Sequence, residues 1–326
     1  MKVIGLFSGA GGLDIGFAKA GAKIVWANDI DEDSCKTYEN YLGDHIVCED
    51  VYNIDPKSVP DADIIIGGFP CLGFTLANVN RKVSDDRNML YQEFLRFLSE
   101  KSPKYFLVEN VPGINRGLNF KENFEKMIRQ FEDVGDVGYD VKPNILNSAD
   151  FGVPQTRKRV IILGTRKNVK NKILHPDHTH AKEGWVTIGD AISDLPLKPT
   201  SEIPNHVGTK HKVRINGYVG NRALSWGKPS PTIMGRGSKT GGPVIHPHPD
   251  KTRRLTPREC ARLQSFPDDV IFSGSISSQY AQVGNAVPCL MAFRIAQKIL
   301  RDVGEKPKKF GPRNWKLPWS KTIPKT

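Results

Sequence analysis

Short apolar runs that stop at glycine, proline or acidic residues recur through the first third of the chain. Between these runs, apolar residues return every three or four positions, as in residues 13–20 and 89–98, which is the spacing of an amphipathic helix. Strands that alternate with helices predict an α/β fold. Four runs predict buried strands, at residues 3–7, 23–27, 64–66 and 105–108.

The pattern changes in the second half of the chain. A polar amphipathic helix around residues 120–131 and strands around residues 139–146 and 160–163 continue the first pattern. From about Gly184 to Asp250, prolines and glycines are frequent and periodicity is weak. This composition predicts a loop-rich segment with few long elements.

Regular structure returns towards the C-terminus. The sequence predicts a short helix with Thr256 as its N-cap and Pro257 at its first position. Another helix is predicted around residues 290–300. The tail, residues 305–326, mixes lysines with prolines and tryptophans, and the sequence leaves open whether it braces the body or follows a nucleic acid.

Composition and charge narrow the class of protein. The 326 residues, 38% hydrophobic, allow one large domain and a smaller one. The five cysteines are widely spaced and form no CxxC pair, which argues against a disulfide framework or a zinc cluster. No apolar run approaches membrane-spanning length and no signal peptide is evident, so we expect a cytoplasmic protein. The net charge of +12 indicates a polyanionic partner without distinguishing DNA from RNA or an anionic surface.

The first predicted strand leads into a glycine turn, Ser8-Gly-Ala-Gly-Gly12, and then into a helix. This order forms a ligand-binding βα unit, because glycines let the backbone approach a ligand and the helix N-terminus offers free N–H groups. The spacing differs from the GxGxxG dinucleotide fingerprint. Asp29 follows the second strand, where a carboxylate often holds ribose hydroxyls. Asp50 is placed either to reach an adenine amine of the same ligand or to cap a turn, and both interpretations stay open.

Candidate chemistry lies where two buried strands end. The apolar run that follows Asp63 breaks into Gly67-Gly68, Pro70 and Cys71, so a thiol lies at the carboxyl end of a strand, where open α/β sheets place their ligands. Glu109 ends the next strand in the same row. Free cysteines are usually inert packing residues, and solvated acids are common at strand ends. Neither residue by itself decides between chemistry and structure.

Two basic features suit an anionic or carbonyl-bearing ligand. Arg157 and Arg159 lie two apart at the start of an apolar strand, so alternation places both guanidinium groups on one face. A basic strand edge that prevents aggregation is the alternative. Between Asn205 and Pro249 the basic residues have no acidic neighbours in sequence, as expected of a solvated surface or of loops that read base edges in a DNA groove.

Six motifs occur in one order along almost the whole chain. They are Phe7-x-Gly-x-Gly11, Pro70-Cys71, Glu109-Asn-Val111, Gln155-x-Arg-x-Arg159, Arg254-Leu-Thr-Pro-Arg-Glu-Cys-Ala-Arg262 and Gly284-Asn285. With the basic insert between the fourth and fifth, the chain resembles the DNA cytosine-5 methyltransferases of bacterial restriction-modification systems. The resemblance implies an α/β, Rossmann-like fold for a methyltransferase dependent on S-adenosylmethionine (SAM). It comprises a mixed sheet with helices on both faces and a small, loop-rich target-recognition domain.

The resemblance also implies a division of the chain. Residues 1–184 would form the catalytic, SAM-binding domain, completed by residues 278–326. Residues 185–258 would form the target-recognition domain, and residues 259–277 a connecting helix and hinge. The last long helix would return to pack on the first domain.

Individual roles follow from the same resemblance. Cys71 would be the nucleophile and Glu109 the acid that protonates or hydrogen-bonds N3 of cytosine, while Arg157 and Arg159 would hold the flipped base and its phosphate. The residues expected to bind SAM are Phe7, Gly9, Gly11, Gly12, Leu13, Asp29, Ile30, Asp50, Val51, Pro70, Leu90, Asn285 and Ala286. Those expected to contact DNA are Thr75, Arg222, Thr232 and Arg236. The product would be S-adenosylhomocysteine, and no metal would be required.

The chain departs from the family pattern at a few positions. Many members carry glutamate where Asp29 stands, glutamine where Leu72 stands and serine where Thr75 stands. Loss of the polar side chain at position 72 predicts altered base-flipping contacts and retained chemistry. The expected partners are duplex DNA and a separate restriction endonuclease, and the enzyme is expected to act as a monomer.

Three other functions fit parts of the sequence. A tRNA cytosine-5 methyltransferase of related architecture would suit Phe74-Thr75, but the long basic insert favours DNA. A catalytically silent DNA-binding regulator would need neither Cys71 nor Glu109. A nicotinamide dehydrogenase is the least favoured, because the glycine spacing and the net charge do not suit it.

Overall fold

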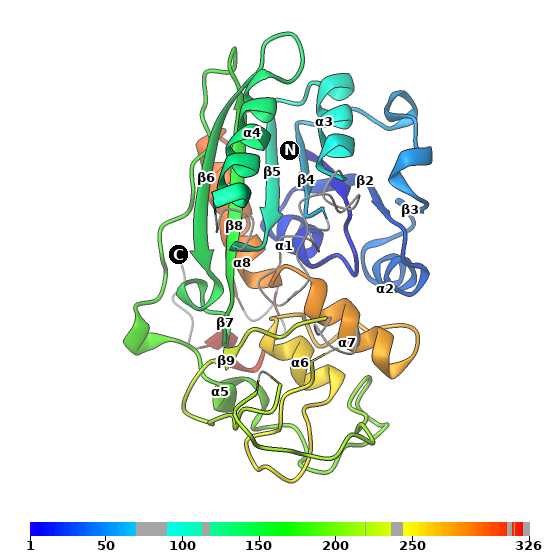
Figure 1. Cartoon of the computed structure of the whole chain (residues 1–326), viewed down its shortest axis with the longest axis vertical. Helices are drawn as coiled ribbons and strands as arrows, with labels where there is room; N and C mark the ends of the chain where they lie inside the picture. The colour runs from blue at the N-terminus through cyan, green and yellow to red at the C-terminus, as the bar shows by residue number, and fades with distance from the viewer. Residues whose placement is uncertain are drawn as a thin grey trace.

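A seven-stranded mixed sheet forms the centre of the upper part of the molecule, in the order β3-β2-β1-β4-β5-β8-β6 (Figure 1). The computed structural model describes residues 1–69, 90–112, 118–218, 220–235, 244–311, 315 and 317–321. The sheet strands are β1 (Lys2–Leu6), β2 (Lys23–Asp29), β3 (Ile46–Cys48), β4 (Ile64–Gly67), β5 (Tyr105–Asn110), β6 (Tyr139–Asn147) and β8 (Lys158–Arg166). The first five are parallel, and β8 runs antiparallel to its neighbours β5 and β6.

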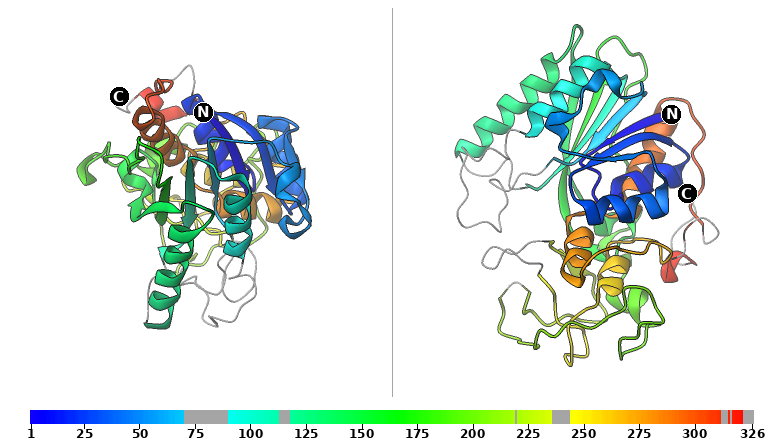
Figure 2. Two further views of the ribbon diagram at one scale, coloured as in Figure 1. Left: turned by 90° about the horizontal axis from the view of Figure 1, so that it is seen from above. Right: turned by 90° about the vertical axis from the view of Figure 1, so that its right-hand side faces the viewer.

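Both faces of the sheet are buried, which explains the continuous apolar runs. Ile64 and Ile66 face one layer of the core, whereas Ile65 between them faces the other. Figure 2 shows helices on both sides. The α-helices of this part are α1 (Gly12–Ala20), α2 (Glu32–Leu42), α3 (Leu90–Lys101), α4 (Leu118–Asp133) and α8 (Cys289–Asp302). The mixed sheet with helices on both faces confirms the predicted fold class.

The last long helix returns to the first one, as predicted. Helix α8 packs against α1, and both cover the same face of the sheet. A Cβ atom at Gly16 would lie only 2.6 Å from the backbone nitrogen of Phe293, so glycine permits the close approach of the two helices. Helices α3 and α4 cover the opposite face through Phe94, Phe97 and Phe131.

The loop-rich segment lies beneath the sheet in Figure 1. Its regular elements are short: α5 (Ile188–Ile192) and β9 (Ser230–Pro231), which pairs with β7 (Gln155–Thr156). Helix α6 (Pro257–Leu263) begins as predicted, with Thr256 as its N-cap. Helix α7 (Ile276–Asn285) comes next in the chain and was not predicted from the apolar pattern.

The described part of the C-terminal tail braces the body. Phe310, Trp315, Leu317 and Trp319 are buried. The indole Nε1 of Trp319 donates a hydrogen bond to the carbonyl oxygen of Gly152 at 3.1 Å. Of the two roles that the sequence left open, these contacts favour the bracing role. Among the described helices, none combines the length and the apolar character needed to cross a membrane.

Candidate active site

The glycine turn lies between the end of β1 and the start of α1. Phe7, Gly9 and Gly11 all have positive φ angles, of 56°, 54° and 83°, so the chain turns sharply before the helix begins at Gly12. Among the described residues, no atom lies within 4 Å of a Cβ built on Gly9. The turn therefore leaves open space beside its backbone, as a ligand-binding turn requires.

Asp29 ties the end of β2 to this turn. Its Oδ2 accepts a hydrogen bond from the backbone N–H of Gly9 at 2.7 Å, and its Oδ1 accepts one from the backbone N–H of Asp31 at 3.0 Å. Burial raises the pKa of the Asp29 carboxyl. The next residue, Ile30, has 65% of its surface exposed, which is unusual for isoleucine and offers an apolar face next to a carboxylate.

Other residues expected to bind SAM surround the turn or lie at nearby strand ends. Asp50 caps the short 3₁₀ helix Val51–Asn53 by accepting from the N–H of Tyr52 at 3.1 Å, so the capping role is observed. Ala286 packs on the start of α1, because a Cβ at Gly12 would lie 3.0 Å from its Cβ. Leu13 and Val51 are buried, Leu90 is half-buried, and Asn285 is exposed.

A second constellation lies at the carboxyl edge of the sheet, around Glu109 near the end of β5. Its Oε1 forms an ion pair with Nε of Arg159 at 2.8 Å, and both side chains are only 11% exposed. The contact results from strand direction: β8 is antiparallel to β5, so β8 begins where β5 ends. The other carboxylate oxygen, Oε2, faces Gly68, where a Cβ would lie 3.0 Å away.

Asn110 connects the same edge to the end of β4. Its Nδ2 donates to the carbonyl oxygen of Phe69 at 3.3 Å, and its Oδ1 accepts from the N–H of Val111 at 2.8 Å. Phe69 is the last described residue before Pro70 and Cys71. The described structure thus carries the chain to two residues before the candidate nucleophile.

Arg157 has different partners from Arg159. Its Nη1 donates to the carbonyl oxygen of Ile233 at 2.7 Å, and its Nη2 donates to that of Gly284 at 3.0 Å. The side chain is 2% exposed, and burial lowers its pKa. Both terminal nitrogens of its guanidinium group are thus bonded to backbone in the described structure.

The expected DNA contacts divide between described and undescribed residues. Arg222 is exposed, and its Nε donates to the carbonyl oxygen of Gly217 at 3.2 Å. Thr232 is half-buried and donates from Oγ1 to the carbonyl oxygen of Thr156 at 3.2 Å. Pro70, Cys71, Thr75 and Arg236 lie outside the described residues.

A comparison with protein families decides the class of the molecule. The family model of C-5 cytosine-specific DNA methylases matches residues 1–301. The chain belongs to this DNA methylase family. It is therefore a DNA cytosine-5-methyltransferase, which confirms the resemblance carried by the motifs.

Relatives of this methylase span nearly its full length. The Type II methyltransferase M.NgoFVII of Neisseria gonorrhoeae is 38% identical, over 92% of this chain and 86% of its own. The Type II methyltransferase M.MthTI of Methanothermobacter thermautotrophicus is also 38% identical, over 93% and 98% respectively. Among solved structures, a protein described as a DNA modification methyltransferase encoded within an E. coli prophage has a TM-score of 0.68 and 26% identity, over 94% of this chain and 100% of its own. The S. pombe Dnmt2 methyltransferase, at 21% identity and a TM-score of 0.62, covers 93% of this chain and 99% of its own and shares the fold.

The methylase places a buried acid behind the glycine turn that the sequence analysis missed. Oδ1 of Asp14 accepts hydrogen bonds from Ser8 Oγ and Tyr38 Oη, each at 3.3 Å. A side chain at Gly5 would overlap this carboxylate, so the glycine in β1 provides its space. Burial raises the pKa of Asp14 from 3.8 to about 7. A polar residue inside the apolar helix pattern, three positions after Gly11, was the available signal.

The SAM that the family implies fits the residues found here. The open turn at Gly9, the carboxylate of Asp29 and the exposed face of Ile30 supply backbone N–H groups, an acceptor for hydroxyls and an apolar platform. Within the described part of the chain, no cluster of three or more His, Cys, Asp or Glu residues is arranged to hold a metal ion.

Proposed function

We propose that this methylase acts on carbon 5 of a cytosine within a short sequence of duplex DNA, through a covalent intermediate on Cys71. The observation that carries the proposal is the pairing of Glu109 with Arg159 at the carboxyl edge of the sheet. Beside this pair, β4 ends at Gly67, and the sequence continues directly to Pro70 and Cys71. The acid Glu109, the cation Arg159 and the thiol of Cys71 together are the groups needed for nucleophilic activation of a pyrimidine ring.

The chemistry requires a nucleophile because carbon 5 of cytosine is too electron-poor to be methylated unaided. The Cys71 thiolate adds to carbon 6, and the ring becomes an enamine whose carbon 5 is nucleophilic. After methylation, carbon 5 loses its proton, the ring regains its double bond and Cys71 leaves as a thiolate. The reactive form is the thiolate, so Cys71 must lose its proton before or during attack.

Glu109 and Arg159 act on the polar edge of the same ring. Glu109 hydrogen-bonds or protonates N3, which draws electron density away from carbon 6 as Cys71 attacks. Arg159 holds the Glu109 carboxylate through the 2.8 Å ion pair and can also donate to the cytosine carbonyl oxygen. Both groups are nearly buried, so water screens these interactions weakly.

SAM supplies an electrophilic methyl group on a sulfonium when it is bound. Asp29 would hold the ribose hydroxyls, and Asp50 would bind the adenine amine. Phe7, Ile30 and Val51 provide apolar contact, while the backbone of Gly9 and Gly11 allows close approach.

DNA recognition is assigned to the basic, loop-rich segment. Arg222, Thr232 and Arg236 contact bases or phosphates there, and Thr75 contacts the DNA beside the nucleophile. The target cytosine leaves the helix stack, because a stacked base cannot be reached by a nucleophile on one side and a methyl donor on the other. Flipping costs a few kcal/mol, which contacts to the phosphates offset.

In the cell, this activity marks host DNA against a separate restriction endonuclease, as in a restriction-modification system. The M.NgoFVII and M.MthTI relatives, both described as Type II methyltransferases, support this role. The same setting implies a monomeric enzyme in the cytoplasm, bound to the nucleoid through DNA.

The substrate is tested by transfer of a tritiated methyl group from SAM to duplex DNA and, separately, to tRNA. We expect 5-methylcytosine in the DNA and none in the tRNA. Label in tRNA alone would identify an RNA methyltransferase on the same fold. A soluble protein that binds SAM and labels neither substrate would indicate a silent DNA-binding protein.

A further inference from the structure

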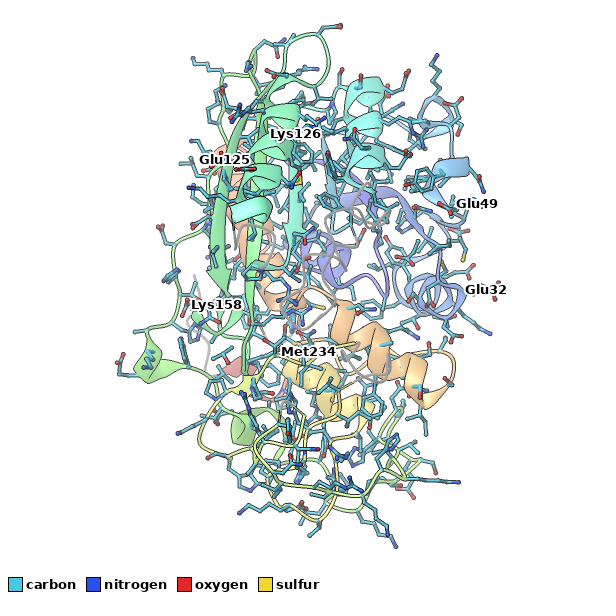
Figure 3. The ribbon with its side chains drawn as sticks, viewed as in Figure 1. Glu32, Glu49, Glu125, Lys126, Lys158 and Met234 are labelled. Carbon is cyan, nitrogen blue, oxygen red and sulfur yellow. The ribbon has the colours of Figure 1, made fainter. Side chains whose placement is uncertain are left out.

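The backbone at residues 234–235 crosses helix α7 in direct contact. A Cβ atom on Gly284 would overlap the backbone of both Met234 and Gly235. A Cβ atom on Gly235 would overlap the Asn285 side chain and lie 2.6 Å from the carbonyl oxygen of Ala281. Figure 3 shows Met234 close to α7, between the sheet and the lower loops. Two glycines are therefore needed for these two segments to meet.

Buried hydrogen bonds fasten the same crossing to the sheet. The guanidinium group of Arg157 bonds to the carbonyl oxygens of Ile233 and Gly284, one on each side of the crossing. Oε1 of Gln155 accepts a hydrogen bond from the N–H of Ile233 at 2.8 Å. The Nε2 of Gln155 donates to Oε1 of Gln264 at 2.7 Å, which links the crossing to the end of α6. All four of these bonds are buried, so the segment has little freedom to shift.

The position of the crossing matters because of its neighbours along the chain. Gly235 directly precedes Arg236, one of the residues assigned to DNA recognition, and a stretch rich in glycine. On the other side of the crossing, the end of α7 leads to Ala286 and Val287, which pack on Gly12 at the start of α1. The crossing thus connects the residue that precedes Arg236 to the start of α1 in the SAM-binding part of the chain.

We propose that Gly235, Gly284 and Arg157 are positioning residues for DNA target selection, because together they fix where the chain enters the segment that begins at Arg236. This inference rests on the proposed function. It assigns Arg157 a role through the backbone of Ile233 and Gly284, distinct from the direct base contact expected from the family resemblance. Side chains that read bases must be placed precisely. A small shift of the backbone at residues 234–235 therefore changes which DNA sequences the enzyme methylates.

The decisive variant is Gly284→Ala, whose methyl group can be accommodated only if residues 234–235 move. The matched control is Gly184→Ala, since Gly184 is exposed and no atom of the described residues lies within 4 Å of its added Cβ. Single-turnover methyl transfer is measured on duplexes with the sequence that the wild type methylates and on duplexes with one base pair changed. We expect Gly284→Ala to reduce the ratio of these rates about tenfold or more, whereas the control keeps the wild-type ratio.

Arg157→Lys distinguishes a positioning role of Arg157 from a direct contact with the base. It is also the milder substitution, and it keeps the test available if Gly284→Ala does not fold. Lysine keeps the charge but cannot bond to both carbonyl oxygens in the same fork. A positioning role predicts that discrimination falls, while SAM affinity without DNA stays within about twofold of the wild type. A base contact predicts equal losses of rate on all duplexes, and this result would overturn the inference.

The outcomes also separate this inference from the proposed function. An active wild type with unchanged discrimination in the folded variants would refute the positioning role alone. A wild type that methylates no DNA would refute the proposed function and the inference that rests on it. Melting temperatures of all variants identify any loss of rate that comes from unfolding.

Discussion

At the scale of single residues, the proposed chemistry depends on how Glu109 is held. Arg159 contacts one carboxylate oxygen at 2.8 Å, and the backbone of Gly68 lies against the other. A carboxylate confined on both sides loses little orientational freedom when the base arrives. We therefore expect Gly68 to matter for the proposed catalysis through the space that it leaves beside Glu109.

Gly68→Ala tests this contribution. The added Cβ would lie 3.0 Å from Oε2 of Glu109, and the ion pair with Arg159 limits how far the carboxylate can retreat. We expect the single-turnover rate to fall about tenfold, because small misplacements of a catalytic group are costly. SAM affinity is measured alongside the rate, because Gly68 follows Gly67, which pairs with Leu6 directly before the glycine turn. A loss of cofactor binding is thereby told apart from misplacement of the carboxylate. A wild-type rate in the variant would show that the carboxylate position is not critical.

Asp14 makes the free energy of unfolding depend on pH, and its contribution can be measured separately. Burial raises its pKa from 3.8 to about 7, so the folded protein binds this proton more tightly than the unfolded chain does. Stability is therefore lost as pH rises from about 4 to about 7, by roughly 4 kcal/mol at most. Asp14→Asn keeps an acceptor for Ser8 and Tyr38 but cannot ionise.

The free energy of unfolding of the wild type should fall relative to that of Asp14→Asn as pH rises from about 4 to about 7. Above this range the difference between the two proteins should level off. Denaturant titrations at a series of pH values measure it. A difference that does not vary with pH would mean that Asp14 has an ordinary pKa in the folded protein.

At the scale of elements, strand direction decides which side chains meet. The apolar runs predicted β1, β4 and β5 and placed Glu109 at a strand end, because both faces of the sheet are buried. The sequence carried no sign that β8 runs antiparallel, yet this direction brings Arg159 to Glu109. Helix α7 was missed because it is rich in serine and glutamine, and its N-cap, Ser275, lies among other turn residues.

Helix α6 offers a test of local sequence signals. Thr256 accepts from the N–H of Glu259, Glu259 accepts from the N–H of Thr256, and the Thr256 hydroxyl also contacts Nδ1 of His206 at 3.0 Å. Thr256→Ala should lower the free energy of unfolding by about 1–2 kcal/mol, because it leaves buried polar groups without partners. Thr256→Ser, which keeps the hydroxyl, is the control. Equal stability of the alanine and serine variants in denaturant titrations would contradict this role of the cap.

At the scale of the whole molecule, the hydrophobic core around α1 and α8 also includes residues of the loop-rich segment, such as Ile188, Leu224 and Ile233. Motif order predicted the family, the fold and the loop-rich insert, since these depend on local residue types. The contacts of Arg157 with Ile233 and Gly284 were not predictable, because they join segments far apart in the sequence. The tail was equally ambiguous until Trp315 and Trp319 were seen to be buried. A net charge of +12 suits the phosphate contacts that the proposed function requires.

The central claim is that the enzyme methylates cytosine in DNA at a defined sequence through a covalent intermediate on Cys71. It is tested most directly by methylome sequencing of plasmid DNA from a methylation-free bacterial host that expresses the wild type or Cys71→Ser. We predict 5-methylcytosine at one short motif with the wild type and none with the variant, because serine cannot supply a thiolate. Unmodified DNA in the presence of soluble wild-type protein, or the same motif methylated by Cys71→Ser, would contradict the account.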